Sequence, residues 1–125
     1  MEKPMAFNVA TAYQNNKINT ASPEESTLIV YEAIIKFCNI AILGIENKDV
    51  NKTHGNIVKA QKAISYLQST LDLTYEVSKN FNNIYVYAYD RLVEANIKKD
   101  KEIVEEVLEH MRGLRDTWKE VMKVK

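Results

Sequence analysis

The chain has 125 residues, of which 46% are hydrophobic and 27% charged, a composition that suits one globular domain and excludes a disordered or low-complexity protein. Seventeen basic and seventeen acidic residues give a net charge of zero, so we expect neither nucleic-acid binding nor membrane insertion. Only three glycines and two prolines occur, and this scarcity of turn residues indicates long helices.

The single cysteine bears on the cellular compartment. Cys38 cannot form an internal disulfide, and it lies in an apolar run that is typical of a buried, unreactive thiol. No secretory signal opens the chain, and no apolar run approaches the roughly 18 residues that a membrane span needs. We therefore expect a cytosolic protein.

Residues 1–20 predict an N-terminal arm. This segment is too apolar to remain free in water and too short to fold alone. We expect it to dock on the remainder of the chain, with one or two helical turns around residues 7–15. The side chains expected to make that contact are Phe7, Val9, Tyr13 and Ile18.

The first long helix is predicted at residues 23–47. Its start carries a capping box, in which Ser22 is the N-cap, Pro23 occupies the first helical position and Glu25 the third. Gly44 and residues 47–49 are expected to end it. Its core side chains are expected at a spacing of three and four residues: Leu28, Tyr31, Ile35, Cys38, Ile42 and Ile45.

Three further helices are predicted at about residues 50–72, 75–97 and 101–123, with Asp49 and Asp100 as N-caps of the second and fourth. The connections between them are only a few residues long, which forces successive helices to run antiparallel. The predicted fold is all-α: an antiparallel up-down four-helix bundle over residues 21–125 with a docked arm.

The sequence lacks the constellations of an enzyme or a metal protein. A di-iron bundle needs Glu-x-x-His motifs, yet neither His54 nor His110 has a glutamate three residues before it. Glu106 and His110 share one helix face, where a solvated contact is the ordinary explanation. There is no glycine-rich phosphate loop or nucleophile elbow. We expect no catalysis, no metal and no cofactor.

Two predicted helices carry more apolar surface than one core stripe requires. Two explanations stay open: the arm and neighbouring helices cover the surplus, or it lines a binding groove for an amphipathic or partly disordered segment. The surplus on 23–47 is Val30, Ile34, Phe37 and Ala41, and that on 75–97 is Val86, Tyr89, Val93 and Ile97.

Three blocks of sequence resemble the flagellar secretion chaperones of the FliS family. The first is Tyr13 followed by Thr-Ala-Ser-Pro-Glu-Glu at residues 20–25; the second contains Ile84-Tyr85, Arg91-Leu92 and Glu94-Ala95-Asn96. The third is Leu114-Arg115-Asp116-x-Trp118. Departures occur at Ser26, where leucine is usual, at Ala33, where glycine is common, and at residues 73–75, a link that often contains glycine.

The resemblance implies a non-enzymatic cytosolic export chaperone. Such a protein binds the disordered C-terminal region of flagellin, prevents its premature polymerisation and keeps it competent for flagellar type III secretion. It also implies that the arm covers part of the binding groove until flagellin displaces it. We place the partner-binding surface at Val86, Tyr89, Val93 and Ile97, with Tyr66 as a further candidate.

Other functions remain open from the sequence. The first alternative is a regulatory helical bundle that binds another flagellar protein or an anti-sigma factor, and a more distant one is a small carrier of a metal or ligand. Flagellar regulators and export components are further candidate partners. For the free protein we expect a monomer or a weak homodimer.

Overall fold

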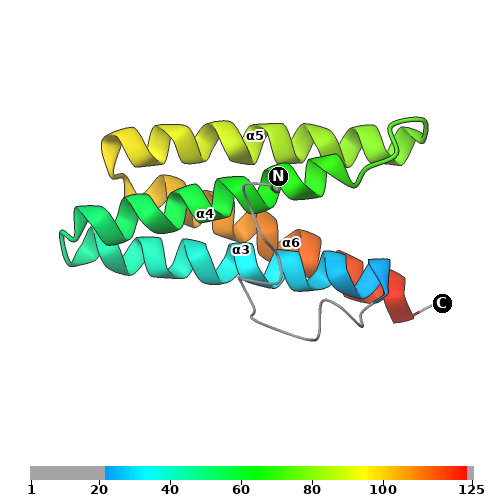
Figure 1. Ribbon diagram of the computed structural model, residues 1–125, viewed down its shortest axis with the longest axis horizontal. Helices are drawn as coiled ribbons and strands as arrows, with labels where there is room; N and C mark the ends of the chain where they lie inside the picture. Colours follow the sequence, from blue (N-terminus) through cyan, green and yellow to red (C-terminus); the bar gives the residue numbers. More distant parts are fainter. Residues whose placement is uncertain (1–21, 124–125) are drawn as a thin grey trace, which may run out of the picture.

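The computed structural model describes residues 22–123, and these residues form four long helices in a single bundle (Figure 1). The helices are α3 (Pro23–Glu46), α4 (Val50–Ser69), α5 (Glu76–Lys98) and α6 (Lys101–Lys123). Successive helices run antiparallel, so the start of α3 and the end of α6 lie at the same end of the bundle. The predicted all-α up-down bundle is confirmed for this part of the chain.

The helix ends follow the predicted capping chemistry. The backbone N–H of Glu25 donates to Ser22 Oγ at 3.1 Å, and that of Ser22 donates to Glu25 Oε1 at 2.9 Å, which completes the capping box. Asp49 caps α4 by accepting from the N–H of Lys52 at 3.0 Å. Asp100 accepts from the N–H of Glu102 at 2.9 Å and opens α6.

Gly44 does not end its helix as predicted. It is buried inside α3, and a Cβ at this position would lie 2.6 Å from Thr53 Oγ1 and 2.9 Å from the Thr53 backbone nitrogen of α4. The glycine therefore allows close approach of two helices. The turn itself depends on Lys48, whose φ of 57° reverses the chain between Asn47 and Asp49.

Each helix has two neighbours around the bundle. α3 packs extensively against α4 and α6, while α5 packs less extensively against α4 and α6. One contact crosses the core diagonally, because the hydroxyl groups of Tyr31 on α3 and Tyr85 on α5 lie 2.6 Å apart in a buried hydrogen bond. Because its contacts with α4 and α6 are less extensive, α5 leaves more of its side chains at the surface.

The surplus apolar stripe on α3 belongs to the core. Its four members are all buried, whereas three positions of the predicted core stripe, Leu28, Ile42 and Ile45, are only partly buried. The prediction placed the centre of the buried face too far to one side, because the inward direction of a helix with apolar residues around most of its circumference depends on its neighbours. The four buried residues are Val30, Ile34, Phe37 and Ala41.

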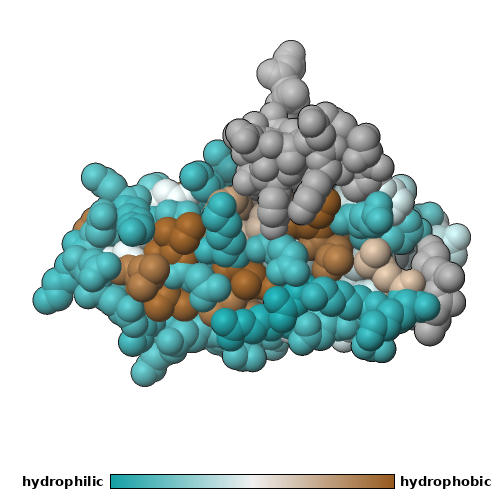
Figure 2. All heavy atoms as spheres, turned by 90° about the horizontal axis from the view of Figure 1, so that it is seen from below, coloured by the Kyte–Doolittle hydropathy of each residue, from teal (hydrophilic) through white to brown (hydrophobic). Residues whose placement is uncertain are grey.

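The composition of α3 differs from the expectation that no segment is long and apolar enough to span a membrane. By length and composition alone, α3 could cross a membrane. Half of its most apolar window is buried inside the bundle, where the same composition serves a core helix. Figure 2 views the side on which α3 lies and shows apolar atoms in separate groups among hydrophilic side chains.

Candidate binding surface

The surplus apolar stripe on α5 remains exposed. Val86, Val93 and Ile97 are 42%, 40% and 78% exposed, and Tyr89 is partly buried against the core. The inward face of α5 is filled by Tyr85, Ala88, Leu92 and Ala95. Val86, Tyr89 and Val93 each follow one of these residues and point about 100° away from it, and Ile97 lies one turn after Val93 on the same outward side. We call Val86, Tyr89, Val93 and Ile97 the α5 stripe.

Two side-chain hydrogen bonds fix the α5 stripe beside α4. Gln68 Nε2 donates to Asn82 Oδ1 at 3.1 Å, and Asn96 Nδ2 lies 2.9 Å from His54 Nδ1. These two bonds are 14 residues apart on each helix, or about 21 Å along the bundle. The register that they set places the α5 stripe along the outer edge of the α4–α5 groove.

The groove is hollowed where the C-terminal part of α4 lies beside the middle of α5. A shallow depression of about 160 Å³ is lined by Ser65 and Gln68 from α4 and by Val86, Tyr89 and Asp90 from α5. Its α5 wall is mainly apolar and its α4 wall is polar. Such a mixed wall can bury apolar side chains of a partner while offering hydrogen-bonding groups to the partner's backbone.

Tyr66 lies on the other flank of α4. Lys59, two helical turns earlier on the same face, has its Nζ 5.8 Å from the ring centroid of Phe37 on α3. Gln68, about 200° around the helix from Tyr66, faces α5 instead. The structure therefore brings the four members of the α5 stripe together but places Tyr66 on the α3 side of α4.

The opposite flank of α5 is polar and internally paired. Arg91 Nε donates to Glu106 Oε1 at 2.9 Å, and Tyr87 donates its hydroxyl to the same carboxylate. These two donors, Tyr87 first and then Arg91, lower the pKa of Glu106. Lys98 and then Arg91 likewise lower the pKa of Glu94. The exposed apolar surface of α5 is thus concentrated on its outer and α4-facing side.

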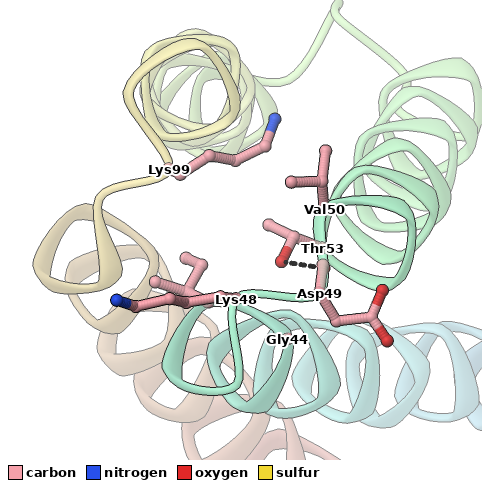
Figure 3. Close-up of a pocket in the computed structure, with 7 residues that line it drawn as sticks. Gly44, Lys48, Asp49, Val50, Thr53 and Lys99 are labelled. Carbon is pink, nitrogen blue, oxygen red and sulfur yellow. Dashed lines mark hydrogen bonds between the residues drawn. The ribbon is translucent and has the colours of Figure 1, made fainter.

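A second hollow lies at the end of the bundle that holds the α3–α4 and α5–α6 turns (Figure 3). It has a volume of about 290 Å³, and its lining includes Gly44, Val50 and Thr53 together with Lys48 and Lys99 from the two turns. The Thr53 hydroxyl donates to the Asp49 carbonyl at 2.9 Å, and Lys99 Nζ donates to Asn96. The polar groups of this hollow thus support the turns.

Buried titratable groups serve the core. Burial raises the pKa of the Cys38 thiol to about 12, so the thiol stays protonated at neutral pH and is a poor nucleophile. Burial also raises the pKa values of Tyr31 and Tyr85, which hold each other by their hydroxyl groups. Among residues 22–123, no group of three or more His, Cys, Asp or Glu side chains could hold a metal ion.

Blocks that are distant in the sequence meet at the end of the bundle where α3 starts. Trp118 Nε1 donates to the backbone carbonyl of Glu24 at 2.9 Å, and the Trp118 ring meets Tyr31 edge-on. Arg115, in the same block as Trp118, reaches Glu32 of α3 at 3.5 Å. The described part of the first block, at the start of α3, is therefore tied to the third block on α6.

A four-helix bundle with an exposed apolar stripe beside a helix–helix groove is typical of a protein that holds another polypeptide. Comparison with known proteins defines the family. The sequence profile described as "Flagellar protein FliS" matches residues 5–125, and the chain belongs to this family. FliS chaperones are non-enzymatic proteins of flagellar secretion.

Relatives described as flagellar secretion chaperones match the chain along most of their length. The chain is 41% identical to the "Flagellar secretion chaperone FliS" of Bacillus subtilis (strain 168) over 116 residues, covering 93% of this chain and 87% of the relative. It is 28% identical to the protein of that name from Campylobacter jejuni over 123 residues, covering 97% and 94%. The corresponding Escherichia coli (strain K12) protein is 28% identical over 109 residues.

Sequence reasoning missed the polar side chains that set the groove. Gln68, Asn82, His54 and Asn96 pair between α4 and α5, and no local pattern distinguishes them from solvated polar residues. Their role depends on the register of two helices, which becomes known only from the assembled bundle. The arm residues Phe7, Val9, Tyr13 and Ile18 lie outside the described residues, as does the helical turn expected at residues 7–15.

Proposed function

We propose that this chain is a cytosolic export chaperone that binds the disordered C-terminal region of flagellin, prevents its premature polymerisation and keeps it competent for flagellar type III secretion. The observation that carries the proposal is the exposed α5 stripe beside the α4–α5 groove. Family membership supplies the class of partner, a flagellar export substrate.

The geometry favours a long, partly disordered ligand over a compact one. The groove is shallow, so it cannot enclose a small molecule, but its length of about 21 Å between the two polar pairs accommodates about four helical turns of a partner. A segment that folds on binding loses conformational entropy, which lowers its affinity, but it can form a long contact with the groove.

We further propose that the arm shields apolar surface of the free protein and that flagellin competes with it. Phe7, Val9, Tyr13 and Ile18 supply the apolar side chains for this cover. An internal cover lowers the apparent affinity for the partner and limits self-association through an exposed apolar surface. Deletion of residues 1–18 should then strengthen binding of a flagellin C-terminal peptide.

Calorimetric titration with a flagellin C-terminal peptide tests the binding surface. Val93→Asp places a carboxylate in the α5 stripe and should weaken binding at least tenfold, because a buried charge without a partner is costly. Val121→Asp is the matched control, since Val121 of α6 is 43% exposed, close to the 40% of Val93. Equal affinity for the two variants would contradict this placement.

A second substitution separates contact from charge. Tyr89→Ala removes the one aromatic side chain of the α5 stripe and should also lower the affinity for the peptide. Tyr87→Ala, on the α6-facing flank, should leave that affinity nearly unchanged. Thermal unfolding of each variant establishes that the bundle is retained. Binding of an anti-sigma factor with no binding of flagellin would favour the regulatory alternative.

A further inference from the structure

Helix α4 has an unusual charge distribution. Its 20 residues contain three lysines and no aspartate or glutamate. The lysines fall on one face, because Lys52, Lys59 and Lys62 are spaced at seven and three residues, with Gly55 and Tyr66 continuing the same face. We call Lys52, Lys59 and Lys62 the lysine stripe.

The positive charge of this stripe is not compensated within the bundle. In the described part of the chain, every ion pair joins residues of α3, α5 and α6, and none includes a residue of α4. The nearby helix α3 does not supply a counter-charge, since Glu32 pairs with Arg115 and Lys119, and Glu46 pairs with Lys101, all on α6.

The lysine stripe runs alongside the outer seam between α3 and α4, where apolar side chains of α3 are partly exposed. Phe37 of α3 lies under Lys59, and Gly44 of α3 contacts Thr53 of α4, so the two helices are close together along this flank. Ile29 and Ile40, on the α4-facing side of α3, are only partly buried. At Gly55 a Cβ would meet no atom within 4 Å, so the surface between Lys52 and Lys59 is open.

We infer that the outer seam between α3 and α4 docks an acidic amphipathic segment of a protein partner, with its carboxylates on the lysine stripe and its apolar side chains against α3. Lys52 and Lys62 are ten residues apart on α4, or about 15 Å, which matches carboxylates at positions 1, 8 and 11 of a helical ligand. This site lies on the opposite flank of α4 from the α5 stripe and does not depend on flagellin binding.

The chemistry favours a protein segment over other anions. Three lysines without an arginine, in a protein of zero net charge, provide few phosphate contacts for a nucleic acid. A seam between two helices fits a narrow ligand with an apolar side better than it fits a lipid surface. Carboxylates distributed along a helix therefore complement this flank best.

A synthetic peptide tests the inference with the full chain. The probe is a fluorescent 15-residue amphipathic peptide with glutamates at positions 1, 4, 8 and 11 and leucines on the adjoining face, measured by anisotropy. The combined variant Lys52→Gln/Lys59→Gln/Lys62→Gln should weaken binding about tenfold, from the loss of three ion pairs. Raising the salt concentration should weaken peptide binding by the wild-type protein and reduce the difference in affinity between the wild-type protein and the triple variant.

The matched control removes the same charge elsewhere. Lys79→Gln/Lys119→Gln/Lys123→Gln changes three exposed lysines of α5 and α6 and should alter peptide binding less than twofold. Circular dichroism should show both triple variants folded. Equal loss in the two variants, or equal binding of a peptide with glutamine in place of glutamate, would overturn the inference. Stripe-dependent binding to anionic vesicles or single-stranded DNA, with none to the peptide, would do so too.

Discussion

Helices α3 and α5 carry similar surplus apolar stripes, and the bundle uses the two differently. Nine of the 24 residues of α3 are buried, compared with five of the 23 residues of α5. Small residues allow α3 to approach its neighbours closely, as at Gly44 against Thr53, so more of its circumference is covered. α5 has a less extensive contact with its neighbours, and its stripe stays at the surface. The same sequence pattern therefore serves a core in one helix and a candidate binding surface in the other.

The largest expected effect comes from truncating equivalent isoleucines in the two stripes. Ile34→Ala removes a fully buried side chain of α3 and should reduce the free energy of unfolding by about 2–5 kcal/mol. Ile97→Ala, in the exposed α5 stripe, should change it by less than about 0.5 kcal/mol. Urea unfolding measures both, and similar losses would remove the distinction between the helices.

Gly44→Ala tests the close approach that covers α3. The added Cβ would lie 2.9 Å from a backbone nitrogen of α4, so the two helices must separate, and we expect a loss of about 1–3 kcal/mol. Gly113→Ala in α6 is the control, because its Cβ would meet no atom within 4 Å. That change should stabilise the protein by about 0.5–1 kcal/mol, since alanine favours a helix. Stabilisation by Gly44→Ala would show that the close approach of α3 and α4 does not require a glycine at this position.

The hydroxyl pair between the two helices supports α5 against α3. Tyr85→Phe leaves the buried Tyr31 hydroxyl without its partner and should reduce the free energy of unfolding by about 1–3 kcal/mol. The double variant Tyr31→Phe/Tyr85→Phe removes both polar groups and should lose less than the sum of the two single variants. Thermal unfolding measures the cycle, and simple additivity would argue against coupling between the two hydroxyls.

The smallest effect concerns the polar flank of α5 at low pH. The pKa of Glu106 is lower in the folded protein than in the unfolded chain, so its contribution to stability is present above the unfolded pKa of about 4.3 and is lost as the pH falls through the folded value. Glu106→Gln should therefore lower stability at neutral pH and flatten the acid dependence. If the substitution left the dependence of unfolding free energy on pH unchanged, Glu106 would not contribute to that dependence.

The sequence predicts the fold well because its indications are local. The capping box at Ser22, the N-caps at Asp49 and Asp100 and the spacing of apolar residues each depend on a few neighbouring positions. The end of α4 is less well predicted: Leu71 continues the apolar spacing, yet the helix ends at Ser69 with Thr70 as its cap. Apolar spacing alone cannot locate a helix end that depends on the following turn.

The candidate site is less predictable because it depends on relations between helices. The spacing of the α5 stripe is local, and the sequence identifies its four members as one face. Its exposure, the separation of Tyr66 from it and the pairing of Gln68 with Asn82 all require the register and rotation of neighbouring helices. The same holds for the lysine stripe, whose lack of counter-charges becomes evident only from the partners of Glu32 and Glu46.

The position of Trp118 gives the protein a built-in spectroscopic reporter. It is the single tryptophan of the chain, and its indole is tied to the first turn of α3 and meets the Tyr31 ring. Its emission should therefore follow separation of α6 from α3. A ligand that occupies only the α4–α5 groove should leave that emission unchanged, so fluorescence can distinguish occupation of the groove from opening of the opposite side of the bundle.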